Sequence, residues 1–350
     1  MYLLVAQFRL WGGVFKKLPV CNKVDDFLRY CEYDCVVECS VDPIYATEVL
    51  AKVLAKNIPV VTMDAETQLL SGTWLSNLGL ISEAEGDQPG SLAALSRDVI
   101  AMGFKPVVYG NIKGFLNHKP SENDMKFWSK KQGIRLDKVT SFTDGTKIQI
   151  EQALVANGMD ATIVKSGMVG AECDDLDQGV GLIVDQHRGS RSISDYVLSS
   201  KLPAGVFIAA KHDDNQKKFL KYYKMGNGPY YTFLRPFHLC HLEMAKTVRQ
   251  IVNERKVLLN NSSKPTVQVY GIAKKDLSIG DTIQQATGSF EVRGEAMLIK
   301  TNVDKIPIGL IADATIVKPV SEGSVISFDD VEIPGSLALT AWKDTLKCVL

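Results

Sequence analysis

The chain has 350 residues, of which 45% are apolar and 23% charged, and forty Lys and Arg residues balance forty Asp and Glu residues. These proportions are typical of a folded globular protein and exclude disordered, collagen-like and coiled-coil architectures for the chain as a whole. A formal net charge of zero argues against a strongly basic nucleic-acid-binding or polybasic membrane protein. The length predicts two or three domains.

The seven cysteines are scattered and form no CxxC pair, which indicates reduced thiols of a cytoplasmic protein. Cys31, Cys35 and Cys39 are spaced four residues apart, but the last two flank a strand-like Val-Val pair. The three thiols would therefore not share one face, and we interpret them as structural rather than metal-binding.

Residues 1–17 begin with an apolar stretch but do not match the pattern of a signal peptide. Gln7 and Arg9 interrupt their apolar stretch, and neither a basic n-region nor a small-residue cleavage site is present. No apolar run in the sequence reaches the roughly 18 residues that span a bilayer. The sequence therefore predicts a cytoplasmic location and no membrane partner.

Helix-like and strand-like segments alternate from residue 24 to residue 85, which predicts a parallel α/β layer. The helix-like spacings cover residues 24–33, 45–56 and 67–78, and the strand-like runs are DCVVECSVDP, IPVVTMD and GLISEAEGD. Each strand-like run ends in small or acidic residues. Ligands of open α/β sheets bind outside the carboxyl ends of the strands, so we expect these residues to line a crevice.

The middle of the chain begins with a turn, Gly86–Gly90, followed by a helix over residues 91–102 that Ser91 would cap. The run KPVVYGNIKGF predicts a strand with Lys113 near its end, residues 117–138 a polar excursion, and DGTKIQIEQALVANGM a helix with Asp144 as its N-cap. A further strand is expected over 203–212, and the loop GNGPYYTFLRPFHLCHLE leads into a helix.

After a polar linker at residues 260–265, short strand-like runs separated by Gly and Asp predict a small β-rich unit up to residue 350. The expected domains are therefore residues 1–88, 89–262 and 263–350.

Several of these segments together resemble the homoserine-dehydrogenase-like oxidoreductases that carry a C-terminal SAF domain, and in particular the 1-deoxy-D-xylulose 5-phosphate reductoisomerase-like group. The segments are VVECSVDP, LAKVLAKNIPVVTMDAE, GDQPG, DGTKIQIEQALVANG, GPYYTFLRPFHLCHLE and, for the SAF pattern, ADATIVKPVSEGSVISFDDVEI. The resemblance implies an α/β fold class: a Rossmann-type parallel sheet, an α+β catalytic domain and a small C-terminal β-rich SAF-like domain. It also implies an NAD(P)-dependent reaction and a homodimer.

The sequence departs from this family in one respect. A GxGxxG loop should follow the first strand of a Rossmann-type domain, because its backbone N–H groups hold the pyrophosphate. The chain has no such loop, and Gly12-Gly13 lack the spacing. The Rossmann-type sheet is therefore interpreted as N-terminally incomplete.

Lys113 and Lys147 are the predicted catalytic residues, with Asp144 beside the second. Reduction of a carbonyl builds negative charge on its oxygen, which a nearby ammonium stabilises or protonates. A lysine at a helix N-terminus, as in DGTK, is unfavourable for the helix dipole and needs another reason for its place.

Five other residues are predicted to contact the substrate, because arginine binds phosphate and carboxylate oxygens bidentately and strand-end or loop residues line clefts. They are Arg188, Arg191, Lys211, Arg235 and His238. His238 and His241 with Glu243 do not form an HExxH motif, so no metal is expected.

By the resemblance, the loops after two strands contact the nicotinamide and ribose of the dinucleotide. The residues concerned are Cys39, Ser40, Asp42, Pro43, Thr62, Met63 and Asp64. The strand end reads VVTMDAE and lacks the Asn-Lys pair of homoserine dehydrogenases, which argues against homoserine as substrate.

Two hypotheses follow. The first is an oxidoreductase that uses NADP or NAD on a small polar, sugar-like carbonyl or hydroxy compound, phosphorylated or not. The second is a truncated or non-catalytic relative that binds a sugar-like ligand without the dinucleotide.

Overall fold

The computed structural model describes residues 4–5, 20–30 and 32–350. Gly12-Gly13, Cys31 and most of residues 1–17, the segment that does not match a signal peptide, lie outside the described residues. Near the described beginning of the chain, β1 (Leu4–Val5) and β2 (Val20–Cys21) pair antiparallel, and α1 (Val24–Tyr30) follows.

The expected parallel layer is present as a three-stranded sheet of order β3-β4-β5. Each strand is short, and helices connect the strands and bury apolar side chains such as Leu50 and Leu75 against the sheet. Helix α2 begins after Asp42, whose carboxylate accepts the N–H groups of Ile44 and Tyr45. The bounds of these elements are β3 (Val36–Glu38), α2 (Pro43–Leu54), β4 (Val60–Thr62), α3 (Ala65–Thr67), the π-helical turn η1 (Gln68–Gly72), α4 (Thr73–Ser76) and β5 (Ile81–Glu83).

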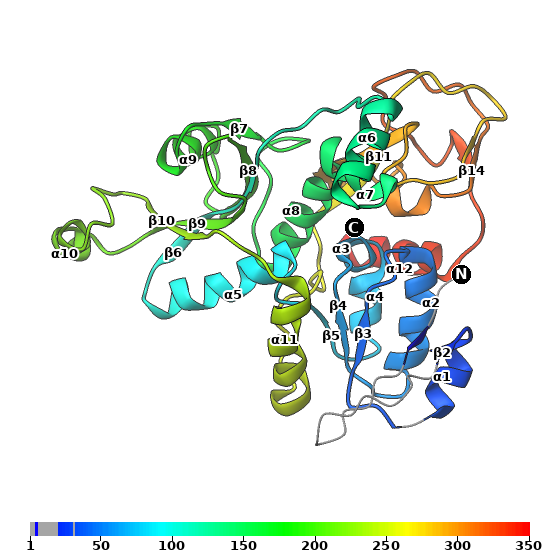
Figure 1. Ribbon diagram of the computed structural model, residues 1–350, viewed down its shortest axis with the longest axis horizontal. Helices are drawn as coiled ribbons and strands as arrows, with labels where there is room; N and C mark the ends of the chain where they lie inside the picture. Colours follow the sequence, from blue (N-terminus) through cyan, green and yellow to red (C-terminus); the bar gives the residue numbers. More distant parts are fainter. Residues whose placement is uncertain (1–3, 6–19, 31) are drawn as a thin grey trace.

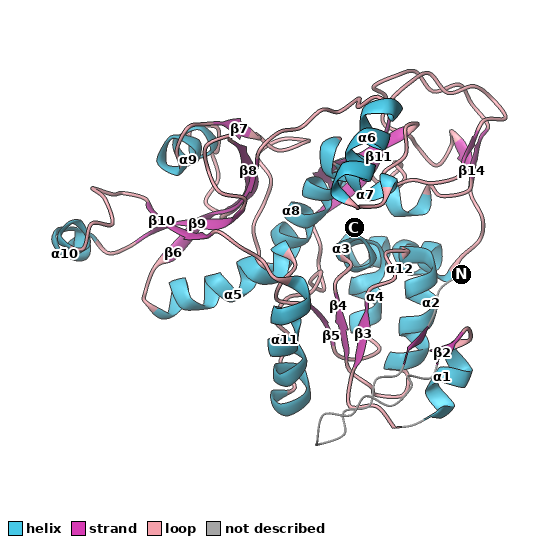
Figure 2. Ribbon diagram, in the orientation of Figure 1, coloured by secondary structure: helices cyan, strands magenta, loops and turns pink. Residues whose placement is uncertain are grey.

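A mixed five-stranded sheet of order β10-β9-β6-β8-β7 forms the second layer (Figure 2). Strands β6, β8 and β7 run parallel; β9 pairs antiparallel with β6, and β10 pairs antiparallel with β9. Side chains alternate in direction along β6: Tyr109 packs under α5, while Val108 and Ile112 pack under α9. The elements are α5 (Gln88–Ala101), β6 (Lys105–Lys113), β7 (Ala171–Glu172), α9 (Leu176–Val184), β8 (Ile193–Leu198), β9 (Gly205–Lys211), η2 (Asp214–Gln216), α10 (Lys217–Tyr222), β10 (Tyr231–Arg235) and α11 (Cys240–Glu254).

The last part of the chain is β-rich up to residue 332 and then returns as a helix. Strands β11 and β13 pair antiparallel, and β12, β14 and β15 form a small antiparallel sheet. Trp342 of the terminal helix is 1% exposed and belongs to the largest apolar core. The elements are β11 (Val267–Ala273), β12 (Thr282–Ile283), β13 (Val292–Leu298), η3 (Ile299–Thr301), η4 (Ile308–Leu310), β14 (Ala314–Ile316), β15 (Val331–Glu332) and α12 (Leu337–Val349).

Helix α8 (Thr146–Gly158) runs through the centre of the molecule, between the mixed sheet and the C-terminal strands (Figure 1). Nearly all of its residues are buried because it packs against β8 on one side and against β11 and β13 on the other. This explains why its sequence shows no single apolar face. Its central position brings residues of its first turns close to both layers.

Several local expectations are corrected by the structure. Ser91 lies inside α5 rather than capping it, because Gln88-Pro89-Gly90 already form the first turn and Asp87 is the N-cap. Residues 117–138 are not simply a polar excursion, since α6 (Glu122–Gln132) and α7 (Leu136–Thr143) occupy most of them. The N-cap of α8 is Gly145, with φ of +88°, instead of Asp144.

Candidate functional site

The two predicted catalytic lysines are close together and share one carboxylate. Lys147 Nζ lies 3.4 Å from Glu151 Oε1, and Lys113 Nζ lies 3.9 Å from Glu151 Oε2. The side chain of Glu151 is 3% exposed, whereas the side chains of Lys113 and Lys147 are 21% and 24% exposed. The buried carboxylate therefore holds two ammonium groups that still reach solvent.

Further polar groups complete this lysine–carboxylate cluster. Lys147 Nζ also donates to Asp87 Oδ2 at 3.3 Å. The carboxamide of Gln88 lies 3.3 Å from Lys113 Nζ, and its NH2 group donates to the Glu151 carboxylate. The Asn111 amide donates to Glu151 Oε2 at 3.3 Å. Lys147 is thus held by two carboxylates, and Lys113 lies between Glu151 and the Gln88 carboxamide.

Local structure explains how these residues meet. Lys113 ends β6, Lys147 stands in the first turn of α8, and Asp87 and Gln88 begin α5. Gly90 allows α5 to approach β5 closely, because a Cβ at this position would lie 1.9 Å from the Ala84 carbonyl oxygen. The ends of one strand and two helices therefore converge on the cluster.

The cluster can stabilise negative charge that develops on a bound oxygen. Burial alone would lower the pKa of Lys147, but the carboxylates of Asp87 and Glu151 outweigh it and hold that pKa above its ordinary value. Lys147 is therefore a permanent cation at neutral pH. A preorganised ammonium in a partly desolvated site is the arrangement that stabilises an oxyanion.

Glu151, Gln88 and Asn111 are not among the residues predicted from the sequence, whereas Asp87 ends the strand-like run GLISEAEGD and was expected to line a crevice. Glu151 follows Lys147 by four residues, a spacing that places both side chains on one face of a helix. Asn111 is a polar residue inside an otherwise apolar strand. These two signals could have identified two of the three missed residues.

Asp144, the third predicted catalytic residue, does not belong to the lysine–carboxylate cluster. It is fully buried, accepts the N–H of Thr146 at 2.8 Å, and pairs with Lys274 at 2.5 Å. Its contacts hold the beginning of α8 and leave no exposed surface for a substrate.

The structure does not bring Arg188, Arg191 and Lys211 to the cluster. Lys211 pairs with Lys105 at the opposite end of β6 from Lys113, roughly 26 Å along the strand. The two arginines precede β8, which runs parallel to β6 with Leu198 beside Lys113, so they too lie at the far end. Arg191 forms an exposed ion pair with Asp160 at 2.6 Å.

Arg235 and His238 lie nearer to the cluster. Arg235 is bound by Glu243 and, at 2.9 Å, by Glu85, so its charge is already balanced. His238 Nδ1 is 3.2 Å from the Gly86 carbonyl oxygen and its Nε2 is 3.4 Å from the Gln88 carboxamide. His238 therefore contacts the residue that lies beside Lys113.

The residues predicted for the cofactor lie at the carboxyl ends of β3 and β4, as expected. This edge is rich in buried acids: Glu38, Asp64 and Glu66 are each less than 10% exposed. Thr62 Oγ1 donates to Glu38 Oε2 at 2.6 Å. Burial, reinforced by Asp64, raises the pKa of Glu38 and raises the pKa of Glu66 to about 7.

A cavity of about 540 Å³ opens beside this edge, between the beginning of α2, the beginning of α7 and the C-terminal strands. Its lining includes Asp42, Pro43, Glu66, Arg135, Lys138 and Thr287. Two residues predicted for the cofactor thus line a cavity large enough for part of a small ligand.

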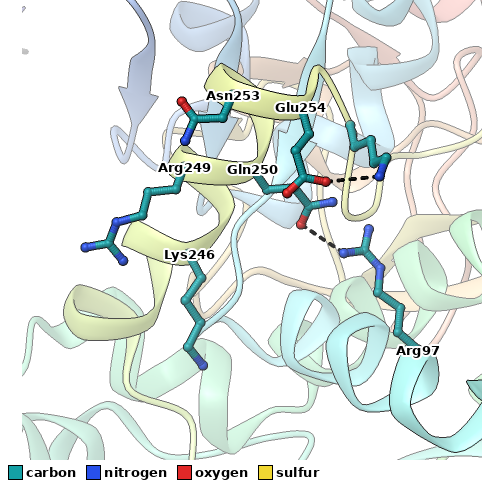
Figure 3. A pocket seen from close by; sticks show the side chains of 7 residues that line it. Arg97, Lys246, Arg249, Gln250, Asn253 and Glu254 are labelled. Carbon is teal, nitrogen blue, oxygen red and sulfur yellow. Dashed lines mark hydrogen bonds and ion pairs between the residues drawn. The ribbon is translucent and has the colours of Figure 1, made fainter.

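A second hollow lies between α5 and α11 (Figure 3). Arg97 donates to Gln250 at 2.8 Å, and Lys256 pairs with Glu254 at 3.0 Å. Arg249 points away from Arg97 in this view. The basic side chains therefore do not converge on one ligand position.

Two classes of feature are absent from the described part of the chain. Among residues 4–5, 20–30 and 32–350, no three His, Cys, Asp or Glu side chains are grouped so that they could hold a metal ion. No described helix combines the length and the apolar character needed to cross a membrane.

Residues 86–244 match the family model described as the catalytic domain of oxidoreductase DRL. No curated protein matches the chain. Two solved structures are similar at 10% identity: a protein described as a myo-inositol dehydrogenase from Sinorhizobium meliloti 1021 (TM-score 0.30, covering 67% of this chain and 76% of that one) and an oxidoreductase from Bacteroides fragilis NCTC 9343 (TM-score 0.27, 69% and 76%). At these TM-scores neither structure supports a statement about this chain.

The family match covers every charged residue of the lysine–carboxylate cluster, namely Asp87, Lys113, Lys147 and Glu151. The cluster therefore lies within a segment that is similar to an oxidoreductase catalytic domain.

Proposed function

We propose that the chain is an NAD(P)-dependent oxidoreductase that acts on a small polar, sugar-like carbonyl or hydroxy compound. The observation that carries the proposal is the pair Lys113 and Lys147, held on either oxygen of Glu151 inside the segment that matches the oxidoreductase domain. Two fixed ammonium groups at one position suit a substrate oxygen that gains negative charge during reduction.

The residues at the carboxyl ends of β3 and β4 fit the nicotinamide end of a dinucleotide better than its phosphates. Buried carboxylates such as Asp64 repel phosphate, but they accept hydrogen bonds from a carboxamide and favour the positively charged oxidised ring. Ser40, Asp42, Thr62 and Asp64 would hold this end. When bound, the nicotinamide supplies or accepts the hydride.

The sharper form of the proposal is reductoisomerase chemistry on a sugar phosphate, which rests on the sequence resemblance. The near neighbours of the two lysines are carboxylates and carboxamides, groups that bind hydroxyls. Comparing a sugar phosphate with the corresponding free sugar in the same assay separates the two substrate classes.

A second candidate function is a ligand-binding relative that does not use the dinucleotide, and the lack of a GxGxxG motif in the sequence favours it. Titration of the folded 350-residue chain with NADPH and NADH, by fluorescence and calorimetry, decides between the two. Micromolar binding of either dinucleotide supports the oxidoreductase. A folded sample that binds neither contradicts it and favours the second candidate.

A further inference from the structure

Glu83 is a buried carboxyl group without a hydrogen-bond donor. It ends β5 beside Thr62 of β4 and is 0% exposed. Both of its carboxylate oxygens are buried, and neither receives a hydrogen bond within the described residues. An ionised carboxylate in such a place lacks both water and a partner, so the neutral acid is the stable form.

The neighbour of Glu83 is another carboxyl group. Asp87 is the charged neighbour that acts most strongly on Glu83, and its Oδ2 accepts the ammonium of Lys147 at 3.3 Å. Two neighbouring carboxyl groups in a buried site cannot both be ionised, and one proton between them turns repulsion into a hydrogen bond. Asp87 is the ionised member because it faces the lysine.

We propose that Glu83 is a neutral carboxylic acid at neutral pH, donates its proton in a hydrogen bond to Asp87, and thereby fixes Asp87 against Lys147. Glu83 is in this view a positioning residue. The protonation of Glu83 stands on the contacts above, whereas its effect on turnover rests on the proposed function.

The other titratable groups around Glu83 support this assignment. Burial and Asp87 raise the pKa of Glu83 well above its ordinary value; Asp64 at the end of β4 acts in the same direction, and Lys147 opposes them.

Helix α11, which packs against β4 and β5, brings no charge to Glu83. Its Glu243 binds Arg235, and its Lys246 binds Glu85 at 2.8 Å. Burial raises the pKa of Cys240 at the beginning of this helix, so that thiol is neutral.

Infrared spectroscopy of the folded chain tests the proton directly. At pH 7 we expect the carbonyl absorption of protonated carboxylic acids to lose the contribution of one group in Glu83→Gln, while the part due to Glu66, whose pKa burial raises to about 7, remains. The matched control is Glu85→Gln, two residues further on, because Glu85 is ion-paired with Arg235 and Lys246 and contributes no such absorption. A spectrum that is unchanged in Glu83→Gln would overturn the assignment.

Kinetics test the positioning role. Glu83→Gln keeps a donor toward Asp87 and should retain most of the turnover, whereas Glu83→Leu removes the donor and should lower kcat by about tenfold or more, with little change in KM. Equal kcat values for the two variants would overturn the role. If this carbonyl contribution is lost in Glu83→Gln but the protein neither binds a dinucleotide nor oxidises or reduces any sugar-like compound, the protonation of Glu83 stands and the proposed function fails.

Discussion

Asp144 and Lys274 form a buried ion pair that joins the beginning of α8 to the C-terminal strands. Lys274 Nζ lies 2.5 Å from Asp144 Oδ2, and their side chains are 4% (Lys274) and 0% (Asp144) exposed. The same carboxylate accepts the N–H of Thr146, directly before Lys147. The position of a candidate catalytic lysine thus depends on a residue more than a hundred positions away.

Removing one partner of this pair should destabilise the protein strongly. Asp144→Asn or Lys274→Met leaves a buried charge without its counter-charge, which typically costs about 3–5 kcal/mol of unfolding free energy. The double variant should lose less unfolding free energy than the sum of the losses in the two single variants. Urea unfolding of the four proteins measures this coupling, and additive effects of the single substitutions would show that the pair is not coupled.

Replacing either cluster lysine should impair turnover more than dinucleotide binding. Lys113→Met and Lys147→Met each remove an ammonium that the proposed function assigns to the substrate oxygen, so kcat/KM should fall by about a hundredfold or more. Dinucleotide affinity, measured by fluorescence titration, should change little because the predicted nicotinamide contacts lie on β3 and β4.

The matched control for these variants is Lys211→Met. Lys211 lies in the same sheet but at the end of β9 away from Lys113, where its ammonium stands 5.1 Å from the Tyr230 ring centre. Its loss should leave kcat/KM unchanged. A drop comparable to that of Lys113→Met would mean that the site extends to the other end of the sheet.

The fold could be predicted from the sequence where the pattern is local. Short apolar runs alternating with amphipathic stretches were enough to predict β3, β4 and β5 with their helices, and apolar runs indicated β6, β9 and β11. The terminal helix α12 was missed because it follows a series of strands, and Trp342 packs in a core that its own neighbours do not reveal.

The candidate site could be predicted only in part, because its charges come from distant positions. Lys113 and Lys147 were found from their places at a strand end and a helix start. The position of Asp87 at a strand end indicates a crevice residue, but neither it nor Gln88 is linked by any local pattern to its lysine, which lies 60 or 25 positions further along the chain. Arg191 lies away from the cluster because β8 runs parallel to β6 and its loop is at the other end of the sheet, a direction that no local pattern contains.

Glu66 should make stability depend on pH. Burial, reinforced by Asp64, raises its pKa from 4.5 to about 7 in the folded chain, so between these values the native state binds more protons than the unfolded state. The free energy of unfolding therefore falls as the pH rises from 4.5 to 7, by up to about 3 kcal/mol from this group.

Glu66→Gln should remove this contribution, and chemical unfolding at several pH values between 4.5 and 8 measures it. Glu48→Gln is the matched control, because Glu48 lines the same cavity but is exposed. A pH profile of Glu66→Gln that parallels the unsubstituted protein would show that Glu66 ionises normally in the fold.

Glu151 should control the reactivity of Lys147. Its carboxylate is one of the two main groups that hold the pKa of Lys147 above its ordinary value, the other being Asp87. In Glu151→Gln the pKa of Lys147 should fall, and the larger fraction of free amine should make Lys147 react faster with an acylating reagent at mildly alkaline pH. Mass spectrometry of digests, with the exposed Glu172→Gln as control, compares the rates at each lysine. Unchanged acylation of Lys147 would mean that Asp87 alone sets its charge, and the shared carboxylate would then be a packing contact rather than the electrostatic centre of the cluster.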